Sequence, residues 1–397
     1  MHIIVNLQPL LTPLTGIGYY TRELTRELVQ QDSLTLEGVT GRKLETLTPE
    51  HPLLQITHNA EQPHSERDHP AWQLARRYLR NPLTRKMYRW LCSQRLQYNI
   101  KHPDALYWEP NYILLPWRGR SVVTVHDLSH ERYPEYHPAE RVRFLNRHLL
   151  ESLQRATRIN VVSQFTANEL QALHGIAPER IDIVPPAVAE RFFLPPCETT
   201  AMSLRQRYQL PQRYLLSVGT LEPRKNLATV LEAFASLPPA EQQAAPLLLA
   251  GMQGWGSQTY SEPVQKALLR GTIRRLGYVP TADLPGLYAL AQGFVYVSLY
   301  EGFGMPVVEA MAAGTPVLTA NTSATTEVAA GAALEVDPRN KDAIRHGLQR
   351  LVGENHDACI AAGKVRAQQF TWPRSAEQLL ASFKRAVSES APTSKHN

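Results

Sequence analysis

Two glutamates separated by seven residues stand in the segment Ser298–Gly314, beside a glycine-containing loop. The segment reads as the end of a strand, a loop with Gly302 and Gly304, and a helix that begins near a proline. A helix N-terminus offers unpaired N–H groups, and glycine lets an oxygen-rich ligand approach the backbone closely. Glu301 and Glu309 can each accept paired hydrogen bonds from a diol. The pattern predicts hydroxyl recognition, although spacing alone equally fits a helix start at which Glu309 only complements the helix dipole.

A pair of cations, Arg224 and Lys225, follows the strand expected at residues 214–218 and the turn at Gly219. Arginine offers a planar fork of donors and lysine a point charge, so the pair suits the oxygens of a diphosphate. Beyond the end of a strand, the two side chains would direct a double positive charge into a cleft. The alternative is a solvated basic turn, where most exposed Arg–Lys pairs occur.

Two weaker candidates come from the N-terminal half. The stretch Gly16–Gly18 permits close backbone approach, but a lone Gly-x-Gly is usually a turn, and Thr21 stands where a dinucleotide fingerprint needs its third glycine. His126 and Asp127 follow a β-branched strand. Histidine can donate to a sugar hydroxyl or a transferring oxygen, and aspartate can accept. A structural His–Asp pair is the alternative reading of these two residues.

Several motifs are missing from the sequence. It contains no Asp-x-Asp pair for a divalent metal bound to a nucleoside diphosphate, so no metal site is expected. It also lacks a Gly-x4-Gly-Lys-Ser/Thr loop and a Gly-x-Ser-x-Gly elbow, which excludes an ordinary P-loop ATPase and disfavours a hydrolase.

Short apolar runs alternate with helical patterns along the 397 residues, which predicts parallel sheets with helices on both faces. The prolines between Val184 and Arg213 interrupt this alternation and indicate irregular structure. We therefore expect two doubly wound, Rossmann-like α/β domains facing a central cleft. The expected boundaries are 1–195 for the first domain, 196–212 for a linker, 213–372 for the second domain, 373–390 for a C-terminal helix, and 391–397 for a disordered tail.

The net charge of +6 is concentrated in one window. Residues 69–103 contain no acidic residue and eight basic ones, which leaves 34 basic and 36 acidic residues elsewhere, a net charge of −2. Aromatic and apolar residues interleave with these cations, a composition that suits an anionic membrane surface. An ordinary amphipathic surface helix is the alternative. The proposed membrane patch consists of Arg76, Arg77, Arg80, Arg85, Lys86 and Arg89.

The remaining composition indicates a cytoplasmic protein, with peripheral contact to the inner face of the cytoplasmic membrane left open. No apolar run reaches the length of a membrane helix, and the start reads as a strand, not as a signal peptide. Three widely spaced cysteines show no metal or redox spacing and fit a reducing compartment. Neither stacking aromatics on a sheet nor a recognition helix is evident, so nucleic-acid binding is not expected.

Taken in order, these segments resemble the retaining GT-B glycosyltransferases of family four. The resemblance extends from the loop at Thr15 to Trp372, and its most specific element is Glu301-x7-Glu309. The stretches around His126 and Arg224 and the stretch Leu276–Val279 support it. Two departures are Thr325-Thr326-Glu327, where relatives often have Leu-Pro-Glu, and Pro186-Ala187-Val188, where Pro-Gly-Val is common.

The resemblance implies that residues 1–195 bind the acceptor, that residues 213–372 bind the nucleotide sugar, and that the helix at 373–390 crosses back onto the first domain. It also implies roles for the candidate residues. Arg224 and Lys225 would hold the donor diphosphate, Glu309 the ribose, and Glu301 the donor sugar, which His126 would contact near the reacting carbon. Such enzymes retain the anomeric configuration by front-face attack, with electrostatic support of the leaving diphosphate. The further donor-binding residues implied are Gly16, Gly18, Gly219, Tyr278, Val279, Phe303 and Gly304, and the candidates on the acceptor side are Asp127 and Tyr19.

The sequence, especially residues 14–18 and 220–226, is similar to those of bacterial mannosyltransferases and rhamnosyltransferases of O-antigen and exopolysaccharide assembly. GDP-mannose is therefore the first expectation for the donor, and a GDP- or dTDP-deoxyhexose the second. The expected acceptor is a lipid-linked oligosaccharide, and no cofactor beyond the nucleotide-sugar substrate is expected. The Glu-x7-Glu element together with Arg224 and Lys225 disfavours a GT-B enzyme that is not a transferase, such as a sugar-nucleotide epimerase. The alternative of a different class is a non-catalytic polyanion- or membrane-binding partner of an assembly complex. The oligomeric state is not predicted.

Overall fold

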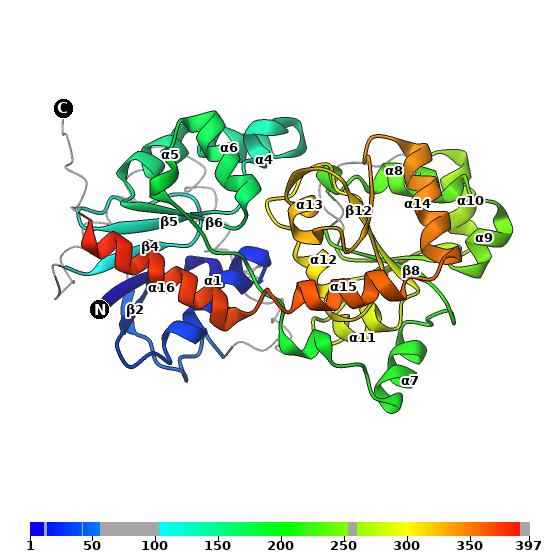
Figure 1. Cartoon of the computed structure of the whole chain (residues 1–397), viewed down its shortest axis with the longest axis horizontal. Coiled ribbons are helices and arrows are strands. Elements are labelled where there is room, and N and C mark those ends of the chain that lie inside the picture. Colours follow the sequence, from blue (N-terminus) through cyan, green and yellow to red (C-terminus); the bar gives the residue numbers. More distant parts are fainter. Residues whose placement is uncertain are drawn as a thin grey trace, which may run out of the picture.

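The computed structural model describes residues 1–11, 14–41, 43–55, 102, 104–220, 222–252 and 260–389. They form two domains, each built around one sheet (Figure 1). Within the described ranges, no helix is both long and apolar enough to cross a membrane. The proposed membrane patch, Cys92 and the whole expected tail, 391–397, lie outside the described residues.

The first sheet has the strand order β3-β2-β1-β4-β5-β6-β7. Only β3 runs antiparallel to its neighbour, and the other pairs are parallel. Its strands are β1 (His2–Asn6), β2 (Thr35–Thr40), β3 (Lys43–Thr46), β4 (Leu106–Glu109), β5 (Ser121–Val125), β6 (Arg158–Val161) and β7 (Ile181–Ile183). The helices of this domain include α1 (Gly16–Leu28), α4 (Ser129–Arg132), α5 (Ala139–Arg155) and α6 (Gln164–His174).

The second sheet is parallel throughout, with the order β10-β9-β8-β11-β12-β13. Its strands are β8 (Leu215–Val218), β9 (Leu247–Ala250), β10 (Ile273–Gly277), β11 (Gly293–Tyr296), β12 (Val317–Ala320) and β13 (Leu334–Val336). Its helices are α8 (Leu227–Ala235), α9 (Pro239–Ala244), α10 (Glu262–Leu269), α11 (Leu284–Ala289), α12 (Met305–Ala312), α13 (Ser323–Ala329), α14 (Lys341–Gly353) and α15 (Asp357–Ala367). Both sheets thus have the doubly wound arrangement, and the expected fold class is confirmed.

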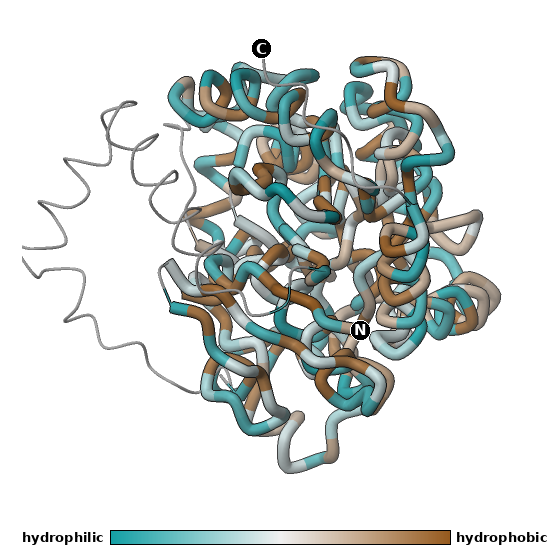
Figure 2. The backbone as a smooth tube through the Cα atoms, turned by 90° about the vertical axis from the view of Figure 1, so that its left-hand side faces the viewer, coloured by the Kyte–Doolittle hydropathy of each residue, from teal (hydrophilic) through white to brown (hydrophobic). Residues whose placement is uncertain are grey.

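Local sequence explains many of these elements. Strand β5 reads Ser-Val-Val-Thr-Val and is buried at every position, as expected for a parallel strand covered on both faces. In Figure 2 the outer helices carry alternating hydrophilic and hydrophobic stretches, which is the pattern of helices with one buried face. The sequence pattern Thr166-x-x-Glu169 resembles a capping box, but α6 begins before it. The N-cap is Ser163, whose hydroxyl accepts a hydrogen bond from the Thr166 N–H.

The proline-rich stretch is more regular than the sequence indicated. It contains a short 3₁₀ helix, Glu190–Phe193, and helix α7 (Glu198–Arg207). Prolines 195 and 196 precede α7, where they do not interrupt a helix. Arg207 pairs with Asp283 at 2.7 Å, so α7 packs on the second domain.

The last helix, α16 (Trp372–Ser388), lies beside α1 on the first domain (Figure 1). A buried ionic network fixes it there. The carboxylate of Asp182 on β7 accepts hydrogen bonds from Arg158 at 2.5 and 2.8 Å, from Ser382 at 2.7 Å and from Arg385 at 2.6 Å. Burial opposes ionisation of Asp182, but these partners together hold its pKa below the ordinary value.

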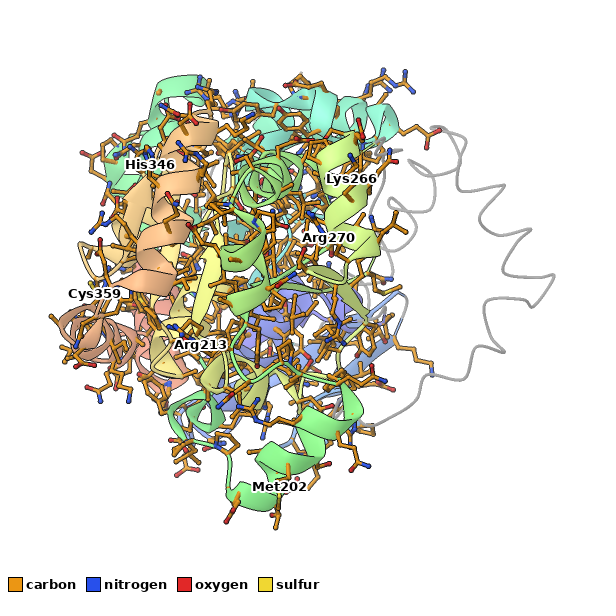
Figure 3. The ribbon with its side chains drawn as sticks, turned by 90° about the vertical axis from the view of Figure 1, so that its right-hand side faces the viewer. Met202, Arg213, Lys266, Arg270, His346 and Cys359 are labelled. Atoms are coloured by element: carbon orange, nitrogen blue, oxygen red, sulfur yellow. The ribbon has the colours of Figure 1, made fainter. Side chains whose placement is uncertain are left out.

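The outer face of the second domain carries scattered charges (Figure 3). Lys266, Arg270 and His346 lie on or near its surface helices, and Cys359 lies on α15. Cys197 and Cys359 are free thiols. In the described part of the chain, no group of three or more His, Cys, Asp or Glu side chains is arranged to hold a metal ion.

Candidate active site

The strand order brings the sequence motifs of the second domain together. Strands β8 and β11 are neighbours at the point where the order reverses, and ligands of doubly wound sheets bind outside the carboxyl ends of such strands. Arg224 and Lys225 follow β8, and Glu301 follows β11. The sheet topology therefore places cations and a carboxylate at the edge that faces the first domain.

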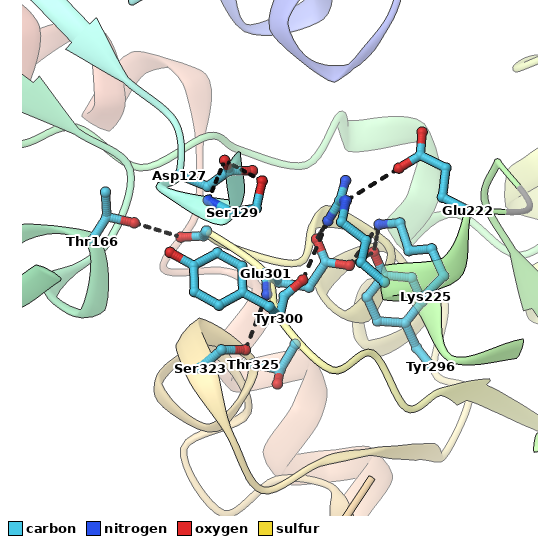
Figure 4. A network of polar contacts seen from close by, with 12 residues as sticks. Asp127, Ser129, Thr166, Glu222, Lys225, Tyr296, Tyr300, Glu301, Ser323 and Thr325 are labelled. Atoms are coloured by element: carbon cyan, nitrogen blue, oxygen red, sulfur yellow. Dashed lines mark hydrogen bonds and ion pairs between the residues drawn. The ribbon is translucent and has the colours of Figure 1, made fainter. Parts of the chain in front are cut away.

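Glu301 stands between the two cations, and Figure 4 shows it beside Lys225 and Tyr296. One carboxylate oxygen lies 2.8 Å from Nη1 of Arg224, and the other lies 2.6 Å from Nζ of Lys225. The hydroxyl of Tyr296 donates to the second oxygen at 2.9 Å and also contacts the Lys225 ammonium. Arg224 makes a second ion pair, from Nε to Glu222 at 3.1 Å. The basic turn is therefore not a solvated one.

Burial and opposite charge compete at this cluster. Glu301 is only 6% exposed. Burial raises its pKa, but the positive charges of Arg224 and Lys225 outweigh burial and lower the pKa to about 2. The carboxylates of Glu301 and Asp127 likewise raise the pKa of Arg224 well above its ordinary value, although burial acts in the other direction. Arg224 and Glu301 are therefore both charged at neutral pH.

Glu309 lies apart from this cluster, on α12. Its carboxylate accepts a hydrogen bond from the Tyr288 hydroxyl at 2.9 Å. Burial raises its pKa to about 7, against the opposing effects of that hydrogen bond and of the positive charge of Arg191. Near neutral pH Glu309 can therefore both donate and accept hydrogen bonds, which suits a pair of hydroxyls.

The raised pKa of Glu309 predicts a pH-dependent stability. The folded protein keeps this proton up to about pH 7, whereas an unfolded glutamic acid releases it near pH ~4.3. Between these values the folded state binds more protons, so the contribution of Glu309 to stability falls as the pH rises. Urea unfolding should show a shallower loss of stability from pH 5 to pH 8 in Glu309→Gln than in wild type. Parallel curves would contradict the assignment, and Glu354→Gln on the surface is the matched control.

The first domain contributes His126 and Asp127 from the end of β5. Nε2 of His126 lies 2.8 Å from the carbonyl oxygen of Pro110, and burial lowers the pKa of His126. A carbonyl can only accept, so Nε2 carries the hydrogen and the other nitrogen of the neutral ring is an acceptor. This differs from the donor role expected from the sequence. Asp127 accepts from the hydroxyls of Tyr112 at 3.1 Å and Ser129 at 2.8 Å.

Tyr300 joins the two domains next to Glu301. Its hydroxyl accepts a hydrogen bond from the Leu128 N–H at 3.1 Å and donates to Glu169 at 3.0 Å. The carbonyl of Gly302 accepts from the Ser163 hydroxyl at 2.6 Å. The segment that carries Glu301 is therefore anchored to the first domain on both sides, and the two strand ends meet as one site.

Gly302 serves this domain contact instead of the ligand approach expected from the sequence. A Cβ at this position would lie 1.9 Å from the carbonyl oxygen of His126. Gly302→Ala should therefore push the domains apart and lower the free energy of unfolding by about 1–3 kcal/mol. Thermal unfolding and small-angle scattering measure the two effects. Gly353→Ala, where nothing lies within 4 Å, is the control, and equal behaviour of both variants would refute the contact.

The other predicted residues occupy varied positions. Gly16 begins α1 with open space around it, whereas Gly18 packs against Leu14 and Pro9. The Tyr19 hydroxyl lies 3.1 Å from the Thr281 hydroxyl across the domain boundary. Gly219 lines a hollow with Lys225 and Tyr296. Gly304 is the N-cap of α12 with φ 104°, and Phe303 is buried against Phe370. Val279 is buried, whereas Tyr278 is 61% exposed.

Several residues of the site were missed from the sequence. Tyr296 holds Lys225 and Glu301, and Tyr288 and Arg191 surround Glu309. Each reads locally as a strand, helix or linker residue. At the departure Thr325-Thr326-Glu327, the carboxylate of Glu327 accepts hydrogen bonds from the N–H groups of Gln164 and Phe165, at 2.9 and 2.8 Å. Glu327 thus caps α6 of the other domain.

Comparison with known proteins shows which family the chain belongs to. A model described as "Glycosyltransferase Family 4" matches residues 14–191, and one described as "Glycosyl transferases group 1" matches residues 203–366. An O-antigen chain mannosyltransferase B of Escherichia coli is 36% identical over 389 residues, which cover 97% of this chain and 100% of that protein. The chain belongs to this glycosyltransferase family. The recognition made from the sequence is confirmed.

Other relatives of this glycosyltransferase are more distant. The serotype-specific mannosyltransferase WbdA of Escherichia coli is 29% identical over 294 residues, which cover 70% of this chain and 35% of that longer protein. Sucrose-phosphate synthase of Thermosynechococcus elongatus shares the fold with a TM-score of 0.69 and 18% identity, over 98% of this chain and 100% of that one. WaaG, a glycosyltransferase involved in lipopolysaccharide biosynthesis, shares the fold with a TM-score of 0.62 and 16% identity, over 96% of this chain and 98% of that one. These likenesses support the GT-B fold.

Proposed function

We propose that this glycosyltransferase moves mannose from GDP-mannose to a lipid-linked or cell-surface oligosaccharide during O-antigen or related polysaccharide assembly, with retention of the anomeric configuration. The relative that matches the chain from end to end carries the name of an O-antigen chain mannosyltransferase. The single structural observation behind the proposal is the cation pair at the switch point of the second sheet, held by Glu301.

The residues of the site divide the work of transfer. Arg224 and Lys225 bind the diphosphate and stabilise the charge that develops on it as it leaves. Glu309 binds the ribose hydroxyls, and Glu301 binds hydroxyls of the hexose. We also propose that the transfer reaction needs no metal ion, because two cationic side chains supply positive charge and the sequence has no Asp-x-Asp pair.

The transfer step needs no protein nucleophile in this scheme. The acceptor hydroxyl oxygen forms a bond to the anomeric carbon on the face from which the diphosphate departs. The bond between that carbon and the diphosphate oxygen breaks, and the oxygen takes the electron pair and then the proton of the attacking hydroxyl. Neutral His126 accepts a hydrogen bond from the hexose and orients it.

The donor base is tested by nucleotide binding. Calorimetric titration with GDP, UDP, dTDP and ADP should show the tightest binding for GDP. Tighter binding of dTDP would move the assignment to a deoxyhexosyl donor, and no binding of any of them would overturn the diphosphate site. Docking on a membrane through residues 69–103 stays a prediction. Flotation with anionic liposomes tests it, and equal binding after replacement of all six patch cations with glutamine would refute it.

A further inference from the structure

The cations assigned to the diphosphate are already neutralised by the protein's own carboxylates. Arg224 and Lys225 contribute two positive charges, and Glu301 and Glu222 contact them with two negative charges at 2.6–3.1 Å. Asp127 of the first domain adds a third negative charge whose field reaches Arg224. The four side chains in contact therefore carry no net charge, although their proposed ligand is an anion, and the charge of Asp127 is itself faced by Arg141.

Glu301 is held mainly by the two cations in this arrangement. Both of its oxygens are engaged, one by Arg224 at 2.8 Å and the other by Lys225 and Tyr296 at 2.6 and 2.9 Å. It is 6% exposed, so water does not stabilise it if the cations turn to another anion. A diphosphate alone would therefore bind against the repulsion of a buried carboxylate.

We propose that Glu301 is an internal counter-anion that exchanges with the donor and helps to expel the product, an inference that rests on the proposed function. When an intact nucleotide sugar binds, the diphosphate takes Arg224 and Lys225, and the hexose hydroxyls replace these cations as hydrogen-bond donors to Glu301. After transfer the hexose is gone and only the nucleoside diphosphate remains. Glu301 then competes for the same cations and weakens the binding of the spent nucleotide.

The exchange separates ligands with a hexose from ligands without one. Removing the charge of Glu301 while keeping its shape should strengthen the binding of a bare diphosphate. The same change removes the acceptor of the hexose hydroxyls, so the intact donor gains less or loses affinity. A residue that merely contacts the sugar would affect only the intact donor, and a purely structural ion pair would affect neither selectively.

The test compares wild type with Glu301→Gln by calorimetric titration of inorganic pyrophosphate, GDP and GDP-mannose. We expect Glu301→Gln to bind pyrophosphate and GDP about tenfold more tightly, with stronger inhibition of transfer by GDP and a smaller gain or a loss for GDP-mannose. Glu354→Gln, which removes one exposed negative charge paired with Arg350, should leave all three affinities unchanged. Equal or weaker binding of pyrophosphate and GDP in Glu301→Gln, beside a wild type that binds them, would overturn the inference alone.

Two further results also bear on the inference. If Glu301→Gln does not fold, Glu222→Gln replaces it, because the Glu222 carboxylate accepts a hydrogen bond from Nε of Arg224. A smaller gain for pyrophosphate in Glu222→Gln then supports the exchange, and no gain contradicts it. If wild type binds neither pyrophosphate nor any of GDP, UDP, dTDP and ADP, the proposed function itself is wrong and the inference falls with it.

Discussion

Replacing Lys225 with methionine is expected to slow sugar transfer by about 10³-fold while the protein stays folded. Lys225 lies 2.6 Å from Glu301 and its ammonium is 4.8 Å from the centre of the Tyr296 ring, at the mouth of the switch point. Methionine keeps most of the length and apolar volume of lysine but removes the charge that supports the leaving diphosphate. Initial rates with saturating donor and acceptor measure the effect.

The matched control for this variant is Lys266→Met. Lys266 lies on α10 at the outer face of the second domain, where it pairs with Glu262 and is 62% exposed (Figure 3). Its replacement removes the same charge far from the cleft, and the transfer rate should remain that of wild type. If Lys225→Met transferred sugar as fast as Lys266→Met, Lys225 would have no place at the diphosphate.

Asp182→Asn is expected to lower the free energy of unfolding by about 3–5 kcal/mol. The carboxylate of Asp182 forms ion pairs with Arg158 and Arg385 and accepts a hydrogen bond from the Ser382 hydroxyl. Both Asp182 and Arg158 are buried. Without the carboxylate charge, Arg158 keeps its ion pair with Glu389, the C-cap of α16, but loses the one with residue 182, and α16 loses the ion pair between Arg385 and β7. Equilibrium unfolding in urea measures the loss.

Asp342→Asn provides the comparison for Asp182→Asn. Asp342 pairs with Arg345 at 3.4 Å on the surface of α14, and it is 74% exposed, so the change should stay within about 0.5 kcal/mol. Because the folded-state pKa of Asp182 is lowered, its contribution to stability is present above pH ~4 and is lost as the pH falls through that lowered value. A loss of stability no larger than that of Asp342→Asn would show that the network does not hold α16.

Local sequence pattern predicted much of the fold because each doubly wound domain repeats one simple rule. The β-branched run at residues 121–125 predicts a strand at the bounds of β5. Helical patterns at residues 140–156, 227–234 and 306–313 agree with α5, α8 and α12 to within one residue at each end. Apolar periodicity, β-branched runs and helix caps are local signals, and here tertiary contacts agree with them. Helix α7 is not predicted from the sequence, because Pro195 and Pro196 indicate irregular structure, although they stand before the helix.

The motifs of the site were predictable from the sequence, but the contacts between the two domains were not. The spacing of Glu301 and Glu309 and the Arg224–Lys225 pair identified the side chains, and the topology explains why they converge. That Tyr300 crosses into the first domain, or that Gly302 touches the backbone of His126, depends on how two separate sheets face each other. Such contacts leave no periodic or spacing signal in either segment. The neutralisation of the cations by Glu222 and Glu301 was hidden for the same reason.

The proposed reaction is tested most directly by its product. The protein is incubated with GDP-α-mannose and a mannose-terminated lipid-linked oligosaccharide, and the product is examined by mass spectrometry and by the one-bond carbon–proton coupling at the new anomeric centre. The account predicts an acceptor longer by one hexose, an α-configured linkage and one GDP released for each hexose transferred. An acceptor that stays unchanged, or a new linkage with the β-configuration, would contradict it.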